Sequence, residues 1–164
     1  MKQDEFISIV MPFKDKLYRL AKRILVSKDE AEDAVQEVYL KLWKGKERIQ
    51  NYKNPEAFAM TMTKNYCLDR LTSNLKIVHN NFQHSENLDK QLDANDGVAI
   101  VFKIMETLPE QQKIILQLRD VEAYEFAEIA EMLDSNETAI RVSLSRARKT
   151  VREQLIKQHN YGIR

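Results

Sequence analysis

The chain has 164 residues, of which 43% are hydrophobic and 31% charged, and its formal net charge at pH 7 is +1. This size allows one domain, or two small ones, with a core. We expect no membrane span, which needs ~20 consecutive apolar residues, and no signal peptide, because the first residues lack a charged-then-apolar order. The single cysteine, Cys67, excludes an internal disulfide and is typical of a reducing compartment, so we expect a cytoplasmic protein.

Glycine and proline are scarce, with three of each, and apolar residues recur at helical spacing along most of the chain. This pattern predicts an all-α fold. The first predicted helix covers residues 4–26. Ser27 followed by Glu30 has the spacing of a capping box, which predicts the start of a second helix that ends at Gly45.

Residues 45–54 show no periodicity and are predicted to form a loop. Asn54 and Pro55 then predict the cap and the first turn of a third helix, which extends to about Thr72.

The polar, weakly periodic stretch over residues 73–97 has the composition of a linker. We therefore predict two small helical domains joined by a flexible linker. The domains are residues 1–75 and 98–164, and the linker is residues 76–97.

The second half of the chain has the layout of a helix-turn-helix. Pro109 is expected in the first turn of a helix that runs to about Asp120, and a short helix over residues 124–133 follows. Ala130 suits the contact between two steeply crossing helices because its side chain is small. After a turn, Asn136 is the expected cap of a long final helix.

The final helix carries two stripes of residues at helical spacing. The apolar stripe, which is expected to face the core, is Ile140, Leu144, Ala147, Val151 and Leu155. The basic stripe is Arg141, Ser145, Arg148 and Arg152, flanked by Arg146 and Lys149. Residues 137–157 hold six bases against two carboxylates, whereas residues 106–136 hold eight carboxylates against two bases. The basic stripe is suited to binding phosphates, and the alternative is the solvated face of an ordinary helical hairpin.

The segment LPEQQKIILQLRDVEAYEFAEIAEMLDSNETAIRVSLSRARKTVREQL resembles the fourth conserved region of bacterial sigma factors, which binds the −35 promoter element. The segments DEAEDAVQEVYLKLWK and NPEAFAMTMTKNYCLDRL resemble the second conserved region, which binds the polymerase clamp and opens the −10 element. Both regions occur in the family's order and together cover nearly the whole chain. With a short linker and nothing else, the chain resembles the extracytoplasmic-function (ECF) group of the sigma-70 family.

The resemblance implies three sets of contact residues. The set expected to bind the coiled coil of the largest polymerase subunit is Asp33, Gln36 and Glu37. The set expected at the separated −10 strand is Tyr52, Lys53, Lys64, Asn65 and Arg70. The set expected at the −35 duplex is Arg119, Arg141, Val142, Ser145, Arg146, Arg148 and Lys149.

Structural roles remain open for several of these residues. The carboxylates of the first set can pair with basic side chains on a partner helix. Alternatively, they only interact favourably with the dipole at the amino-terminal end of their own helix. Tyr52 can also cover the core, and Arg70 can pair with the neighbouring Asp69. Arg148 and Lys149 are expected near phosphates or facing solvent.

Two positions of the helix-turn-helix depart from the family. Asp134 stands where a turn glycine is frequent, and its side chain tolerates a left-handed backbone. Ala123 stands where glycine is common before the first helix of the motif, so the geometry of that corner is open.

No motif indicates catalysis, a metal or a cofactor, so we expect a protein that is not an enzyme. His79, His84 and His159 lack the spacing of metal ligands, and Cys67 is expected as a buried small residue. The resemblance implies core RNA polymerase, promoter DNA and an anti-sigma factor as partners, with no small-molecule substrate. The alternatives are a stand-alone dimeric helix-turn-helix regulator, and a helical adaptor that binds only protein.

Overall fold

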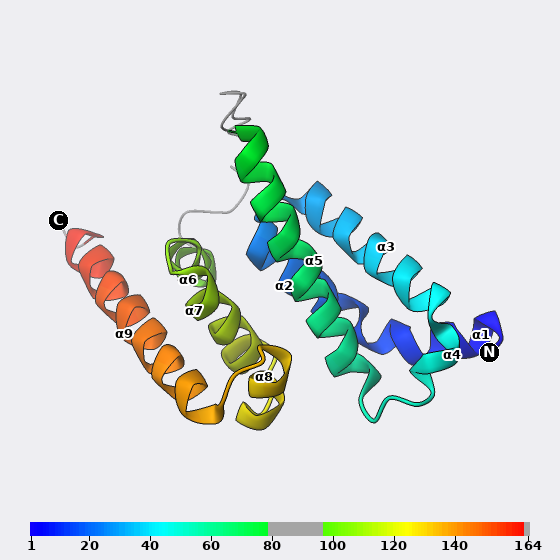
Figure 1. The fold of residues 1–164 in the computed structure, drawn as a ribbon. Coiled ribbons are helices and arrows are strands. Elements are labelled where there is room, and N and C mark those ends of the chain that lie inside the picture. The colour runs from blue at the N-terminus through cyan, green and yellow to red at the C-terminus, as the bar shows by residue number, and fades with distance from the viewer. Residues whose placement is uncertain (79–96, 163–164) are drawn as a thin grey trace.

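The computed structural model describes residues 1–78 and 97–162, and within them it contains helices and connecting turns but no strand (Figure 1). The predicted all-α class is confirmed. Most of the linker expected over residues 76–97 lies outside the described residues, together with His79 and His84. No described helix has both the length and the apolar composition that crossing a lipid bilayer demands.

The chain begins with α1 (Gln3–Val10), the single 3-10 turn η1 (Met11–Phe13) and α2 (Lys14–Leu25). The prediction of one continuous helix over residues 4–26 is therefore wrong. The break lies at Pro12, which has no backbone N–H to donate and whose ring collides with the preceding helical turn.

Helix α3 (Lys28–Lys44) begins where the capping box predicts, because the hydroxyl of Ser27 accepts a hydrogen bond from the Glu30 N–H at 3.3 Å. Gly45 follows its last residue, as predicted. The loop predicted over residues 45–54 contains a short helix, α4 (Lys46–Ile49), with Ile49 buried. One turn of helix is too short to produce a recognisable period, so the sequence pattern did not reveal it.

Helix α5 (Pro55–Val78) starts at the predicted position, with the Asn54 side chain accepting a hydrogen bond from the Ala57 N–H at 3.0 Å. It extends beyond the predicted end at Thr72. We call α1 to α5 the first helix group. Within it, α2 packs against both α3 and α5 and supplies fully buried side chains such as Leu17 and Leu20.

The second helix group contains α6 (Gly97–Glu106), α7 (Glu110–Leu116), the π-helical turn η2 (Gln117–Val121), α8 (Phe126–Met132) and α9 (Glu137–Gly162). Pro109 caps α7 rather than lying inside its first turn. Helix α9 packs against α6, α7 and α8, and so closes the second core.

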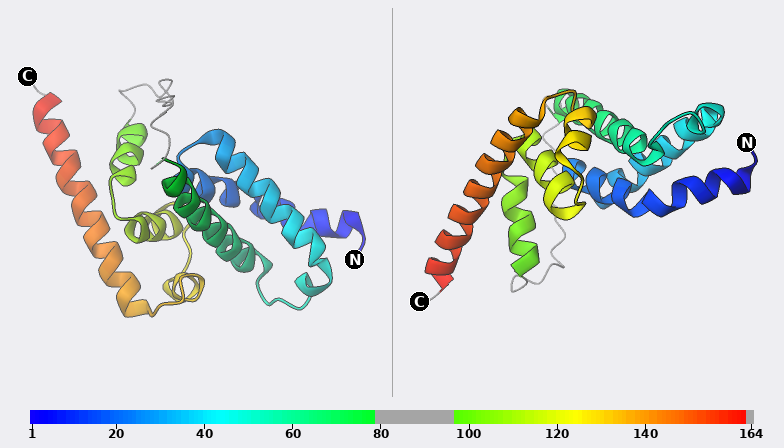
Figure 2. Two further views of the ribbon diagram at one scale, coloured as in Figure 1. Left: turned by 45° about the horizontal axis from the view of Figure 1, so that its top comes forward. Right: turned by 90° about the horizontal axis from the view of Figure 1, so that it is seen from below.

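The two helix groups lie side by side. Helix α2 contacts α7, α5 contacts α8, and most of the buried apolar residues form one continuous cluster through both groups. Figure 2 shows the outer helices of the two groups, α1 and α9, carrying the amino and carboxyl termini to opposite ends of the molecule. Figure 1 shows α3 and α9 on opposite sides of the molecule, with α2, α5, α6 and α7 between them.

Candidate functional site

The predicted helix-turn-helix is formed by α8, a short turn and α9. Asn136 caps α9, its side-chain oxygen accepting a hydrogen bond from the Ala139 N–H at 2.8 Å, as predicted. Asp134, at the position where a turn glycine is frequent, adopts a left-handed backbone with φ of 51°. Ala130 is buried at the α8–α9 contact, and Ile140 of α9 is fully buried.

The first turns of α9 present an exposed face. Its side chains at the −35 positions lie outside the core, and Val142, an apolar residue, is 43% exposed. Apart from the ring contact of Arg141 described next, these side chains have no hydrogen bond or ion pair with another described side chain. The exposed set is Arg141, Val142, Ser145, Arg146 and Lys149.

Arg119 and Arg141 meet at one aromatic ring. The guanidinium carbon of Arg119 lies 4.3 Å from the centroid of the Phe126 ring, and that of Arg141 lies 4.1 Å from it. Arg119 also donates a hydrogen bond to the backbone oxygen of Tyr124 at 2.8 Å, and its carboxylate neighbour is Glu125 at 3.8 Å. Because a helical period cannot show what stacks on a ring, the sequence pattern did not indicate this contact of Phe126.

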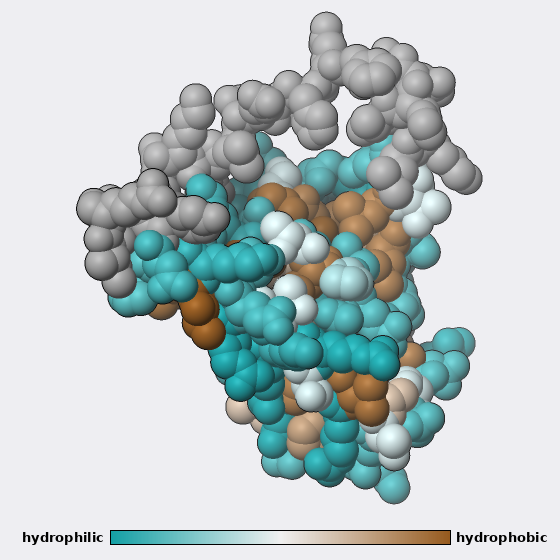
Figure 3. All heavy atoms as spheres, turned by 90° about the vertical axis from the view of Figure 1, so that its left-hand side faces the viewer, coloured by the Kyte–Doolittle hydropathy of each residue, from teal (hydrophilic) through white to brown (hydrophobic). Residues whose placement is uncertain are grey.

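Arg148 points away from the exposed face, toward η2. Its Nε donates to the Asp120 carboxylate at 3.0 Å, and this hydrogen bond raises the pKa of the guanidinium. The pair borders an apolar groove between α6, η2 and α9. Arg152 also borders the groove, and the apolar lining residues are Val101, Phe102, Met105, Leu116, Val121, Val151, Leu155 and Ile156. Figure 3 shows apolar patches on this otherwise largely hydrophilic side of the molecule.

The expected polymerase-binding residues lie on the outer side of α3. Asp33 and Gln36 are exposed and Glu37 is half-buried, whereas the intervening Val35 and Val38 are buried in the core. Gln36 also borders an apolar groove between α1 and α3. The remaining lining residues are Gln3, Phe6, Ile7, Tyr39, Leu40 and Trp43. Leu40 is 52% exposed, and a leucine outside the core stripe of its helix is the signal that could have identified this groove from the sequence.

Two of the residues expected at the −10 strand are free at the surface and two others form internal contacts. Lys53 and Asn65 are exposed. Tyr52 stacks on Phe58 with ring centroids 4.2 Å apart, and Arg70 donates to the Asp33 carboxylate at 2.8 Å. Arg70 thus pairs with a residue of the polymerase set instead of the neighbouring Asp69.

Lys64, the fifth residue of the −10 set, contacts the second helix group. Its ammonium donates to the backbone oxygen of Met132, at the end of α8, at 2.9 Å. Burial lowers the pKa of Lys64, and nearby Asp134 opposes that shift. The contact places a candidate −10 residue directly beside the helix-turn-helix.

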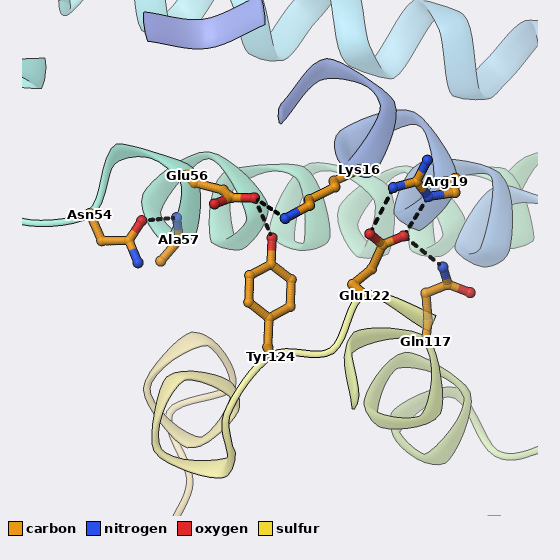
Figure 4. Close-up of polar contacts among 8 residues, drawn as sticks. All are labelled: Lys16, Arg19, Asn54, Glu56, Ala57, Gln117, Glu122 and Tyr124. Carbon is orange, nitrogen blue, oxygen red and sulfur yellow. Dashed lines mark hydrogen bonds and ion pairs between the residues drawn. The ribbon is translucent and has the colours of Figure 1, made fainter. Parts of the chain in front are cut away.

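A network of polar side chains joins the helix groups, and we call it the group interface (Figure 4). Arg19 of α2 donates two hydrogen bonds to Glu122, at 2.6 and 2.9 Å. The Glu122 side chain is only 1% exposed, and it also accepts a hydrogen bond from Gln117 at 3.3 Å. Gln117 in turn accepts one from Arg23 at 3.0 Å. Burial of the Glu122 carboxylate is offset by these three hydrogen bonds, two of them from a charged donor.

Glu56 of α5 makes the second part of the group interface. It pairs with Lys16 at 2.6 Å and accepts a hydrogen bond from the Tyr124 hydroxyl at 3.1 Å (Figure 4). Burial and the Glu56 carboxylate both raise the pKa of Tyr124 above its ordinary range. These residues are far apart in the chain, so the sequence analysis contained no signal for their pairing.

Cys67 is fully buried, as expected, and burial raises the pKa of its thiol to about 12. The thiolate, which is the reactive form, is therefore disfavoured. Among the described residues, no three side chains of the types that bind metals gather at one place.

Comparisons with known proteins agree on one family. The family model of sigma-70 region 2 matches residues 9–76, and that of sigma-70 region 4 matches residues 99–151, so the two together cover most of the chain. The ECF RNA polymerase sigma factor SigJ of Mycobacterium tuberculosis is 30% identical over 94% of this chain, which spans 51% of that relative's length. The ECF RNA polymerase sigma factor SigW of Bacillus subtilis is 27% identical, with 93% of this chain and 90% of SigW covered.

Solved structures show the same fold. The sigma factor RpoE of Bartonella quintana, in complex with the anti-sigma factor NepR, matches with a TM-score of 0.79 at 19% identity, covering 92% of this chain and 96% of that one. CnrH, in complex with the cytosolic domain of CnrY, matches with a TM-score of 0.68 at 16% identity, covering 95% and 90%. The chain belongs to the sigma-70 family, as an ECF sigma factor.

Proposed function

We propose that this protein gives core RNA polymerase its promoter specificity through three separate surfaces. The outer side of α3 binds the polymerase, α5 with the loop before it binds the separated −10 strand, and α8 with α9 binds the −35 duplex. The proposed domains are residues 1–75 and 98–164, with residues 76–97 as the linker between them.

The observation that carries the proposal is the exposed face on the first turns of α9. In helix-turn-helix proteins, the amino-terminal half of the second helix enters the major groove and its side chains contact base edges. Here that half exposes Arg141, Val142, Ser145 and Arg146. Arginine suits guanine edges, and the apolar Val142 suits a thymine methyl group. Arg119 and Lys149 are suited to the flanking phosphates, and Arg148 to a phosphate once its pair with Asp120 opens.

The −10 surface combines aromatic and basic groups, which single-stranded DNA requires. Tyr52 offers a ring for stacking, Lys53 is exposed beside it, and Asn65 is free to bind a base edge. Lys64 and Arg70 are proposed to bind the backbone of the strand.

The polymerase surface combines the Asp33, Gln36 and Glu37 side chains with the adjoining apolar groove of α1 and α3. Carboxylates beside an apolar groove suit a partner helix that carries both basic and apolar side chains.

The small net charge supports a dependence on the polymerase for tight binding to promoter DNA. A protein of net charge +1 displaces few counterions from DNA, so we propose that its own affinity for DNA is weak. Specificity would then arise when the polymerase fixes the spacing of the two DNA-binding surfaces, which makes the second contact effectively intramolecular.

We propose further that an anti-sigma factor binds the free protein. One structure of the same fold contains such a partner, RpoE bound to the anti-sigma factor NepR, and CnrH of the same fold is bound to the cytosolic domain of CnrY. The family also supports a cytoplasmic location and a protein that itself catalyses no reaction, because the chemistry of RNA synthesis belongs to the polymerase.

Run-off transcription with core polymerase across a genomic fragment library tests the proposal. We expect discrete start sites that depend on this protein, with footprints on two elements upstream of each. A symmetric footprint in the absence of polymerase would favour the dimeric regulator instead. Binding of proteins alone, with no DNA protected under either condition, would favour the adaptor. Neither alternative accounts for the match to both sigma-70 regions in one chain.

A further inference from the structure

We propose that Phe126 is a positioning residue: its ring holds Arg119 and Arg141 in the orientation in which they contact the −35 duplex. The inference rests on the proposed function, because it presumes that these arginines bind DNA. It adds a residue that contacts no DNA itself but sets the orientation of two arginines that do.

The first step is the geometry of the two stacks. Arg119 comes from η2 and Arg141 from the second turn of α9, yet both guanidinium carbons lie within 4.3 Å of the Phe126 ring centroid. One side chain at the start of α8 therefore links the segment before the helix-turn-helix to its second helix. Arg146, also exposed on α9, has no such stack.

The second step is that the ring itself is fixed. Phe126 is the first residue of α8, is half-buried, and packs against the apolar core. The preceding corner is held by the hydrogen bond from Arg119 to the Tyr124 backbone oxygen at 2.8 Å. Arg119 is thus held by the ring, by the Tyr124 backbone oxygen and by Glu125 at 3.8 Å, whereas Arg141 is held only by the ring.

The third step is what stacking does for recognition. A guanidinium that stacks on a ring keeps its N–H donors in the plane, directed outward and available for bidentate hydrogen bonds to a guanine or a phosphate. The ring also attracts both cations through its quadrupole, which counteracts their mutual repulsion. Holding the side chains in place before binding reduces the rotamer entropy that is otherwise lost in the complex.

The test compares Phe126→Leu with Phe126→Tyr in the holoenzyme. Leucine retains an apolar side chain but removes the ring, whereas tyrosine keeps it. The probe is a promoter fragment recovered by run-off transcription, in competition with a duplex of randomised −35 sequence. We expect Phe126→Leu to weaken the preference for the promoter by roughly 5-fold to 30-fold, as two cation–π contacts imply, and Phe126→Tyr to retain it.

A double-mutant cycle separates positioning from a loss of folding. When Arg141 is already replaced by alanine, Phe126→Leu should weaken the preference for the promoter only a few-fold further, because only the Arg119 stack remains to be lost. In an Arg146→Ala background the effect of Phe126→Leu should persist in full. An equal effect in both backgrounds, or no effect in either, would overturn the inference.

A second measurement needs no promoter. Relaxation of the side-chain Nε–Hε group of Arg141, measured by NMR in the free protein, should show restricted motion that Phe126→Leu releases. Equal mobility in the two proteins would also overturn the inference. The proposed function fails separately, if Arg141→Ala itself leaves promoter preference unchanged.

Discussion

The candidate surfaces on α9 and α5 differ in how far their residues are already engaged within the protein. On α9, Arg146 and Ser145 are exposed and have no ion pair among the described residues, and Arg141 only stacks on a ring. On α5, Lys64 donates to the Met132 backbone oxygen and Arg70 to the Asp33 carboxylate. Apart from Arg148, which pairs with Asp120, the proposed duplex-binding side chains of α9 are therefore already exposed in the free protein. On α5, Lys64 and Arg70 of the proposed strand-binding surface must give up internal contacts before they bind.

The difference between the two surfaces has a physical basis in the DNA that each is proposed to bind, a duplex for α9 and a separated strand for α5. A duplex is a rigid shape that a preformed helix face can meet with little rearrangement. A separated strand exists only after promoter opening, so nothing is lost if the side chains that bind it pair elsewhere until then. The following substitutions test the comparison, from the largest expected effect to the smallest.

The largest effect is expected at the preformed surface. Arg141→Ala should reduce promoter binding by the holoenzyme roughly 10-fold to 100-fold, since a bidentate base contact contributes about 1–3 kcal/mol. Lys157→Ala is the matched control, because Lys157 is exposed on the same helix but three turns or more away. Competition between promoter fragments provides the measurement, and equal losses in the two variants would indicate only a general charge effect.

The group interface is tested by Glu122→Gln, which preserves shape but removes the charge that Arg19 contacts. We expect the free energy of unfolding to fall by about 1–2 kcal/mol, less than for a fully buried pair because the Arg19 side chain is 45% exposed. Trp43 is the only tryptophan and lies in the first helix group. Its fluorescence during urea unfolding should show the lower free energy of unfolding, even though Trp43 lies in the first helix group and the substitution in the second.

Glu131→Gln, at an exposed position of α8, is the control for that experiment. The same Glu122→Gln variant should also bind a single-stranded −10 oligonucleotide more tightly than the wild type does, by at most roughly 30-fold. Its affinity for the −35 duplex should not change. A gain on both probes would contradict the contrast between the two surfaces.

A pH titration tests the Tyr124–Glu56 contact. The pKa of Tyr124 is raised in the folded protein, so the corresponding stabilisation is complete below the unfolded value of about 10 and decreases as the pH rises above it. We expect the wild-type free energy of unfolding to decrease, relative to Tyr124→Phe, by up to about 1.4 kcal/mol per pH unit in that range. Tyr39 and Cys67, whose pKa values are raised to about 12, are present in both proteins and cancel. If the free energies of unfolding of the two proteins change with pH in the same way, the pKa of Tyr124 is not raised by folding.

The smallest effect is expected at the corner before α8. Ala123 has a φ of 62°, a left-handed backbone that costs free energy for any residue with a Cβ. Ala123→Gly should therefore raise the free energy of unfolding by about 0.5–1 kcal/mol, after subtracting the entropy that glycine adds to the unfolded chain. Thermal unfolding followed by circular dichroism measures this gain. A loss of stability instead would mean that the corner is not strained.

Local signals explain which parts of the fold could be predicted. Ser27, Asn54 and Asn136 each cap a helix through a contact three residues along the chain, and such contacts are visible in sequence. The break at Pro12 was missed because the apolar spacing continues through it. The helix-turn-helix itself was predictable because its core residues repeat at helical spacing.

Contacts across long sequence separations could not be predicted. Arg19 and Glu122 are 103 positions apart, and nothing in either neighbourhood indicates the other. The same limit applies to the shared ring of Phe126, since Arg119 and Arg141 lie on different elements. Which of the candidate residues are free and which are engaged is thus a property of the folded chain.

The group interface has a consequence for how the protein is distributed between conformations. If the −10 and −35 elements are separated by roughly 20 base pairs, they lie roughly 70 Å apart along the duplex at 3.4 Å per base pair. If both elements are bound at once, the helix groups, which touch through Arg19, Glu122 and Tyr124, must separate. The apparent dissociation constant for a promoter would then be the intrinsic one divided by the fraction of molecules whose groups are separated. Substitutions at the Arg19–Glu122 salt bridge, which lies away from the proposed DNA contacts, should consequently change the rate of transcription initiation.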